Sequence, residues 1–165
     1  RAAAGVAAFT GTGRRFEHRG VAKGVSFIDD YAHHPTEVAA TLAAASGWEG
    51  GRVVAVFQPH LYSRTQRLAD RFGAALAVAD VVVVTDVFAA REDPIEGVDG
   101  TLISAAARRH GATDVVDAPD RSTLVEVVAA LIRPGDLVLT MGAGDVTAVA
   151  EELGAVPPGA VIETP

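Results

Sequence analysis

Short β-branched runs alternate along this chain with Ala- and Leu-rich segments of helical length, and few architectures accommodate that alternation. The apolar runs at 52–57, 81–84 and 137–140 are too short for helices, so they predict buried strands. Weaker strands are predicted at 25–28 and 114–116. Strands that alternate with helices favour an α/β layered domain with a mostly parallel sheet of about six strands.

Helices are predicted between and after these strands, at 35–45, 63–79, 102–110, 122–131 and 146–153. Pro35 suits a first helical turn, and Asp120 suits an N-cap position. Gly111 and Gly154 fall where a C-terminal glycine belongs. A last short edge strand is predicted at 160–162.

The composition excludes several classes of function. The 165 residues include 14 Lys and Arg against 21 Asp and Glu, and the net charge of −7 disfavours a general nucleic-acid binder. No stretch approaches the ~20 consecutive apolar residues of a membrane span. The chain has no Cys, which excludes disulfides and thiolate chemistry and suits a reducing compartment. Lys23 is the only lysine and does not end a Gly-rich turn, so it cannot serve a Walker-type phosphate loop.

A polar segment follows the strand predicted at 25–28. Seven of the nine residues at 29–37 are polar or ionisable. Ligands of parallel sheets bind at the carboxyl ends of strands, so this position favours a functional site over an ordinary polar loop with a helix cap. A carboxylate such as Asp30 suits a ribose hydroxyl or a metal ion, whereas His33 and His34 suit proton transfer or an anion.

A second polar segment follows the strand predicted at 52–57. Ser63, with Gln66 three residues later, predicts a capping box at a helix N-terminus. His60 and Arg64 are then expected around a helix end that favours anions. The Arg fork is the natural partner of a carboxylate or a phosphate, because it donates two parallel hydrogen bonds.

Three further segments carry weaker signals. The charged segment 86–94 follows another strand but holds fewer discriminating residues. The Gly-Ala-Gly-Asp turn at 142–145 matches half of a dinucleotide fingerprint, with Thr147 at the third glycine position, so a structural turn and a ligand-facing turn both stay open. The segment 1–23 carries five basic residues and one acidic residue, against nine and twenty in the remainder. It is either a mixed surface or the source of an Arg for a phosphate held by another domain.

Four motifs then indicate a family. They are Gly-Thr-Gly-Arg-Arg-Phe-Glu at 11–17, Asp-Asp-Tyr-Ala-His-His-Pro-Thr-Glu at 29–37, Phe-Gln-Pro-His-Leu-Tyr-Ser-Arg-Thr at 57–65 and Gly-Ala-Gly-Asp at 142–145. Through these motifs the chain resembles, over essentially its whole length, the C-terminal part of enzymes of the Mur ligase family. The second and third motifs together are the specific ones.

The resemblance implies a Rossmann-like three-layer α/β domain that is the third of three domains and brings in the amino acid. Residues 1–23 are expected to be a linker from a central ATPase domain, and residues 24–165 are expected to form the C-terminal domain. The implied reaction joins L-alanine to UDP-N-acetylmuramate in the cytoplasm, through an acyl phosphate formed with ATP. ATP and Mg²⁺ are expected to be held mainly by the central domain, so no metal ligands are assigned here.

The resemblance also implies residue roles. Asp30 matches an acidic position near the ATP ribose, and Arg14 matches a linker Arg that faces the nucleotide phosphates. The expected surroundings of the amino-acid substrate are Tyr31, His33, His34, His60 and Arg64. Arg64 is the candidate partner of the substrate carboxylate and His33 the candidate catalytic base, while the individual role of His34 is open.

The expected partners are the two substrates, ATP, and the N-terminal and central domains of the same protein, with no nucleic acid and no membrane. Two other functions stay open. One is the related ligase that recycles a peptide onto the same UDP-sugar. The other is a free-standing nucleotide- or anion-binding module without catalysis.

Overall fold

A computed structural model describes residues 13–155, and the edge strand expected at 160–162 lies outside them. The strands are β1 (Glu17–Ala22), β2 (Val25–Asp30), β3 (Val53–Phe57), β4 (Val81–Thr85), β5 (Val115–Ala118) and β6 (Leu137–Met141). The helices are α2 (Pro35–Ala45), α3 (Tyr62–Leu76), α4 (Thr101–Arg109), α5 (Arg121–Leu131), the 3₁₀ helix η1 (Asp145–Ala148) and α6 (Val149–Glu152).

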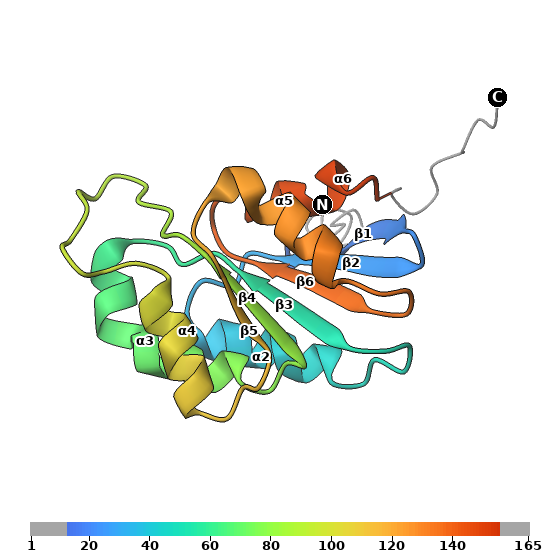
Figure 1. The fold of residues 1–165 in the computed structure, drawn as a ribbon, viewed down its shortest axis with the longest axis horizontal. Coiled ribbons are helices and arrows are strands. Elements are labelled where there is room, and N and C mark those ends of the chain that lie inside the picture. Colours follow the sequence, from blue (N-terminus) through green and yellow to red (C-terminus); the bar gives the residue numbers. More distant parts are fainter. Residues whose placement is uncertain (1–12, 156–165) are drawn as a thin grey trace, which may run out of the picture.

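The strands form one sheet in the order β1-β2-β6-β3-β4-β5 (Figure 1). β1 is antiparallel to β2, and the other neighbours are parallel. The last strand along the chain, β6, therefore lies between β2 and β3. This order places the carboxyl ends of β2, β6, β3 and β4 next to one another, where ligands bind in open parallel sheets.

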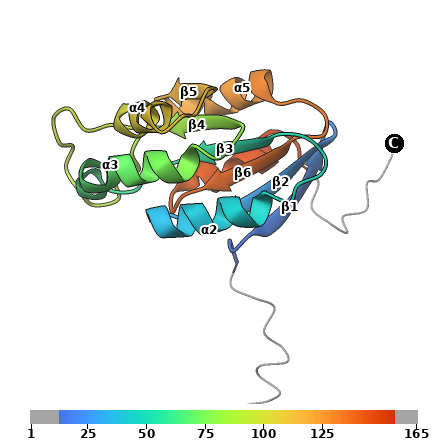
Figure 2. The same cartoon turned by 90° about the horizontal axis from the view of Figure 1, so that it is seen from below.

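Helices cover both faces of the sheet, which gives three layers (Figure 2). Along β3, Ala55 and Phe57 pack on the side of α2, α3 and α4. Val54 and Val56 alternate with them and pack on the side of α5, η1 and α6. The Phe57 ring lies 5.0 Å from the ring of Phe72 on α3, in the larger of these two buried layers. The predicted α/β fold with a mostly parallel sheet is confirmed.

The predicted strands and helices are confirmed in place, with small shifts at their ends and with 146–153 divided into η1 and α6. The sequence pattern does not predict β1, because its residues Glu-His-Arg-Gly-Val-Ala are half polar. β1 is nevertheless an outer strand of the sheet, and its register with β2 shifts between His18 and Gly20. Part of the expected linker at 1–23 is thus built into the sheet.

Most predicted helix caps are confirmed, and one is wrong. Pro35 begins α2, and Asp120 accepts a hydrogen bond from the Ser122 amide at the start of α5. The capping box predicted from Ser63 is absent, because α3 begins at Tyr62 and so places Ser63 inside its first turn. The residue before Tyr62 is Leu61, which has φ 72° and no side chain able to cap.

Candidate active site

Five side chains form a row across the carboxyl ends of β2, β3 and β4. The guanidinium carbon of Arg14 lies 5.1 Å from the centre of the Tyr31 ring, and that centre lies 5.0 Å from the centre of the His33 ring. The His33 ring is 5.8 Å from the His60 ring, and His60 stacks on Phe88 at 5.9 Å. Four of the five were predicted as site residues from separate segments, and the fold brings them together.

Asp30 ends β2 beside this row. Its Oδ2 accepts a hydrogen bond from the Phe16 amide and its Oδ1 accepts one from the Ala32 amide, each at 2.8 Å. A carboxylate offers about four lone-pair positions, so Asp30 retains acceptor capacity. It lines a groove of about 330 Å³ together with Phe16, whose ring is partly exposed.

Arg14 is fixed across the ends of β2 and β6. Its Nε donates to Oδ2 of the fully buried Asp29 at 2.8 Å. Its Nη2 donates to the Gly142 carbonyl at 2.7 Å and its Nη1 to the Gly144 carbonyl at 3.4 Å. A guanidinium carries five N–H groups, so one N–H on each Nη stays available to an anion.

His33 and His34 precede α2 and differ in what they contact. His33 Nδ1 lies 2.9 Å from the Tyr31 carbonyl oxygen. His34 is the N-cap, and its Nδ1 accepts a hydrogen bond from the Thr36 amide at 3.4 Å. Glu37 completes a capping box by accepting hydrogen bonds from both histidine amides. Burial raises the pKa of Glu37, but these amides and the adjacent His33 hold it below its usual value.

His60 and Arg64 meet His33 at the start of α3. Arg64 Nη1 donates to the His33 carbonyl at 3.2 Å, and Arg64 makes no ion pair with any carboxylate in residues 13–155. His60 Nδ1 is buried and has no hydrogen-bond partner in that same range. Burial lowers the pKa of His60, and the nearby charges of Arg64 and His33 lower it further. The pair thus offers a cation without a bound anion beside a neutral imidazole.

The Gly-Ala-Gly turn after β6 is held tightly by its neighbours. Gly142 has φ 147°, and a Cβ there would lie 2.8 Å from the Gln58 carbonyl oxygen. A Cβ on Gly144 would meet the Gln58 side chain and, at 2.7 Å, the Phe88 ring. Of the two interpretations left open, close structural packing explains both glycines, and their carbonyls face Arg14.

Comparison with known proteins decides the family. The family described as "Mur ligase, glutamate ligase domain" matches residues 14–144 of this chain. The chain belongs to the Mur ligase family. The resemblance seen in the sequence motifs is therefore confirmed.

The chain spans about a third of the length of the longer proteins that it matches. It is 54% identical over 153 residues to a UDP-N-acetylmuramate–L-alanine ligase of a Mycobacterium species (strain JLS), covering 90% of this chain and 31% of that protein. It is 48% identical over 151 residues to the enzyme of the same name from Pelotomaculum thermopropionicum, covering 92% and 33%. A solved UDP-N-acetylmuramate-alanine ligase from Thermotoga maritima is 28% identical, with a TM-score of 0.68 and coverage of 88% and 30%.

Two residues of the Mur ligase domain that sequence reasoning missed are Phe88 and Glu92, in the loop after β4. Phe88 stacks on His60, and Glu92 accepts hydrogen bonds from Ser63 at the start of α3. The strand end at 86–94 signalled a polar loop. The loop reaches His60 and α3 because β4 lies beside β3, and local sequence does not predict that pairing.

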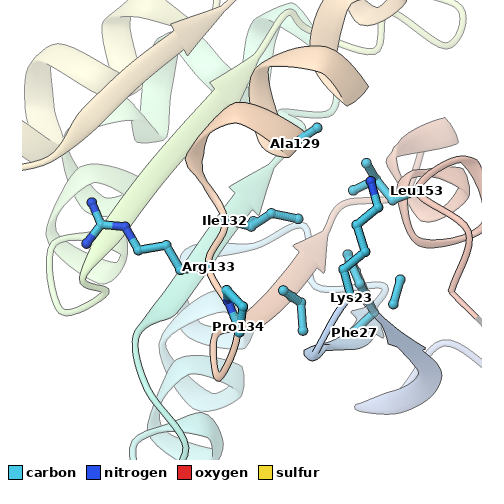
Figure 3. A pocket seen from close by; sticks show the side chains of 9 residues that line it. Lys23, Phe27, Ala129, Ile132, Arg133, Pro134 and Leu153 are labelled. Carbon is cyan, nitrogen blue, oxygen red and sulfur yellow. The ribbon is translucent and has the colours of Figure 1, made fainter.

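An apolar pocket of about 280 Å³ opens elsewhere on the Mur ligase domain, between the β1–β2 turn and the ends of α5 and α6 (Figure 3). Phe27, Ile132 and Leu153 contribute to its lining. It borders the amino end of β2, so it lies at the opposite end of the sheet from the active-site row.

Within residues 13–155, no group of three or more His, Asp and Glu side chains is arranged to hold a metal ion. Over the same residues, every helix is too short or too polar to cross a membrane.

Proposed function

We propose that this chain is the C-terminal domain of an ATP-dependent ligase that joins L-alanine to UDP-N-acetylmuramate through an acyl phosphate, in cytoplasmic peptidoglycan synthesis. The observation that carries the proposal is the meeting of His33, His60 and Arg64 in a Mur ligase domain whose relatives bear that enzyme's name. In this proposal, residues 1–23 lead from a central ATPase domain, with β1 joined to the sheet, and residues 24–165 complete the C-terminal domain.

Arg64 binds the carboxylate of alanine. Its contact with the His33 carbonyl fixes the guanidinium and leaves most of its N–H groups available. A carboxylate takes two parallel hydrogen bonds from such a fork. The neutral His60 beside it offers hydrogen bonding without a second positive charge.

His33 removes the proton that alanine must lose before its nitrogen can attack. A carbonyl oxygen only accepts hydrogen bonds, so the 2.9 Å contact with the Tyr31 carbonyl requires the proton of a neutral His33 on Nδ1. The lone pair is then on Nε2, where the ammonium proton is accepted. The amine forms a bond to the acyl carbon, and the bond from that carbon to the phosphate oxygen breaks.

Asp30 and Arg14 contribute to the nucleotide site. The acceptor capacity of Asp30, next to the groove beside Phe16, suits ribose hydroxyls, and the two N–H groups left on Arg14 suit phosphate oxygens. ATP supplies the phosphoryl group that activates the muramate carboxylate, and Mg²⁺ is held mainly by the central domain. His34 supports this arrangement from the α2 N-cap, next to the substrate-binding residues.

The position of the domain over the reacting groups also contributes to catalysis. Closure of a third domain over the acyl phosphate excludes water and holds the amine close to the carbon it attacks. Its own N-terminal and central domains are therefore its partners, and nucleic acid and membranes are not.

A chimeric ligase tests the proposal: this chain replaces the corresponding third of the Mycobacterium ligase that is 54% identical to it. We expect the chimera to form UDP-N-acetylmuramoyl-L-alanine, detected by mass spectrometry, with one ADP released per product. The truncated Mycobacterium protein and the 165-residue chain alone are the controls, and neither should turn over.

The same assay separates the alternatives. Activity with a peptide and not with L-alanine indicates the recycling ligase. Tight ATP binding by the chain alone, measured calorimetrically, together with an inactive chimera indicates a free-standing binding module. Either outcome overturns the proposed function.

A further inference from the structure

The first turn of α3 obtains its cap from another loop. Leu61 cannot cap the helix, and Ser63 is already inside the first turn. The Ser63 amide donates instead to Glu92 Oε2 at 2.9 Å, and the Ser63 hydroxyl donates to Glu92 Oε1 at 2.6 Å. A carboxylate at this position satisfies amides that the helix leaves free and also meets the positive end of the helix dipole. The Ser63 hydrogen bonds hold the pKa of Glu92 below its usual value, so it is anionic at neutral pH.

Glu92 lies four residues after Phe88 in a loop that is paired with the segment before α3. The Phe88 amide donates to the Pro59 carbonyl at 2.8 Å, and the Leu61 amide donates to the Phe88 carbonyl at 3.0 Å. The chain then turns, with the Glu92 amide bonded to the Ala89 carbonyl at 3.0 Å. The loop is therefore fastened at both ends, by backbone pairing at Phe88 and by the carboxylate at Glu92.

This fastening determines the surroundings of His60. The Phe88 ring lies almost parallel to the His60 ring, at an angle of 15°, and it also rests on Gly144. The His33 ring makes an edge contact with His60, at 5.8 Å between ring centres. The imidazole thus contacts two rings, and the one that stacks on it, Phe88, belongs to the loop that Glu92 fastens.

We propose that Glu92 is a positioning residue for the amino-acid site: its carboxylate fastens the loop after β4 to α3 and so keeps Phe88 against His60 and the start of α3 in place around Arg64. This inference rests on the proposed function. Glu92 is not a stand-in for the substrate carboxylate. Such a stand-in would pair with Arg64, and no ion pair joins the two in residues 13–155.

The test uses Glu92→Ala and Glu92→Gln in the chimeric ligase, with Asp93→Ala as the matched control. Asp93 is the adjacent acidic residue, is exposed, and its carboxylate makes no hydrogen bond or ion pair within residues 13–155. Glu92→Ala should raise the KM for alanine about tenfold, the loss expected for a hydrogen bond to a charged group, with the KM for ATP changed by less than about twofold. Glu92→Gln keeps one acceptor oxygen and should recover part of the loss. Asp93→Ala should match the unsubstituted chimera.

Ser63→Ala adds a second measurement, because it removes one of the two contacts from the other side. The effects of Ser63→Ala and Glu92→Ala on the alanine KM should be less than additive in the double variant, since both remove the hydrogen bond from the Ser63 hydroxyl to Glu92. A fall in the alanine KM of Glu92→Ala would mean that Glu92 competes with substrate, and an unchanged value would mean that it positions nothing. Both overturn the inference while the chimera stays active, whereas an inactive unsubstituted chimera overturns the proposed function.

Discussion

Arg14 Nε lies 2.8 Å from Asp29 Oδ2, and that carboxylate is completely buried beneath the candidate active site. The same Asp29 accepts hydrogen bonds from the hydroxyl groups of Thr140 and Thr147, at 2.7 and 2.8 Å. One carboxylate therefore joins β2, β6, η1 and the segment before β1. Because Arg14 also binds the carbonyls of the turn after β6, this contact connects the packing of the sheet with the geometry of the site.

Asp29→Asn should destabilise the domain strongly. The Asn side chain keeps the size of Asp but places an NH₂ group or a neutral oxygen where three donors converge. We expect the free energy of unfolding in denaturant to fall by about 3 kcal/mol, as when a buried ion pair loses one partner. Asp117→Asn is the control, because its ion pair with Arg108 is exposed and should contribute less than about 1 kcal/mol. Equal losses in the two variants would contradict the role given to Asp29.

The neighbouring aspartates also show what the sequence can and cannot predict. Alternating runs were enough for the layers and for the strand ends where ligands bind. The sequence pattern could not predict that Asp29 is buried and bonded to three other segments while Asp30 lines a groove. That difference depends on β6 lying beside β2. Glu92 was missed for the same reason: its partner, Ser63, is 29 residues away, and local propensity made Ser63 itself the cap. The candidate site residues could be chosen from local sequence, whereas the contacts that support them join distant segments.

Gly142→Ala should cost more than an ordinary substitution at a left-handed glycine. Both Gly142 (φ 147°) and Gly111 (φ 99°) have backbone conformations that strain Ala, at about 1–2 kcal/mol. Only at Gly142 does the added Cβ meet backbone, 2.8 Å from the Gln58 carbonyl oxygen, which adds about 1–3 kcal/mol of overpacking. Urea unfolding should therefore show a larger loss for Gly142→Ala than for Gly111→Ala. A larger loss for Gly111→Ala than for Gly142→Ala would contradict the predicted clash with the Gln58 carbonyl.

Stability should fall on acidification from pH 7 to pH 5, in part through His60. Burial, followed by the charges of Arg64 and His33, lowers its pKa in the folded state. The unfolded chain then binds more protons around the ordinary histidine pKa of about 6.5, so acid favours unfolding by at most about 1.4 kcal/mol per pH unit. His60→Asn should flatten the dependence of the unfolding free energy on pH in this window. An unchanged slope in His60→Asn would contradict this role of His60.

Arg64→Ala in the chimeric ligase should raise the KM for alanine far more than the KM for ATP. The guanidinium makes one contact with the His33 carbonyl and no ion pair in the described residues, so its charge is available to a substrate carboxylate. Loss of charge-assisted hydrogen bonds worth about 1.5–3 kcal/mol corresponds to a rise of about 10- to 100-fold. Arg64→Lys keeps the charge but not the forked guanidinium, so its KM for alanine should lie between those of the unsubstituted chimera and Arg64→Ala.

Arg67→Ala is the matched control for this series, because Arg67 lies one turn further along α3 and is exposed. It removes the same charge from the same helix without touching the row, so both KM values should stay within about twofold of the unsubstituted chimera. An alanine KM that is equally raised in both variants would point to the general charge of α3. An unchanged alanine KM in Arg64→Ala would remove Arg64 from the substrate site.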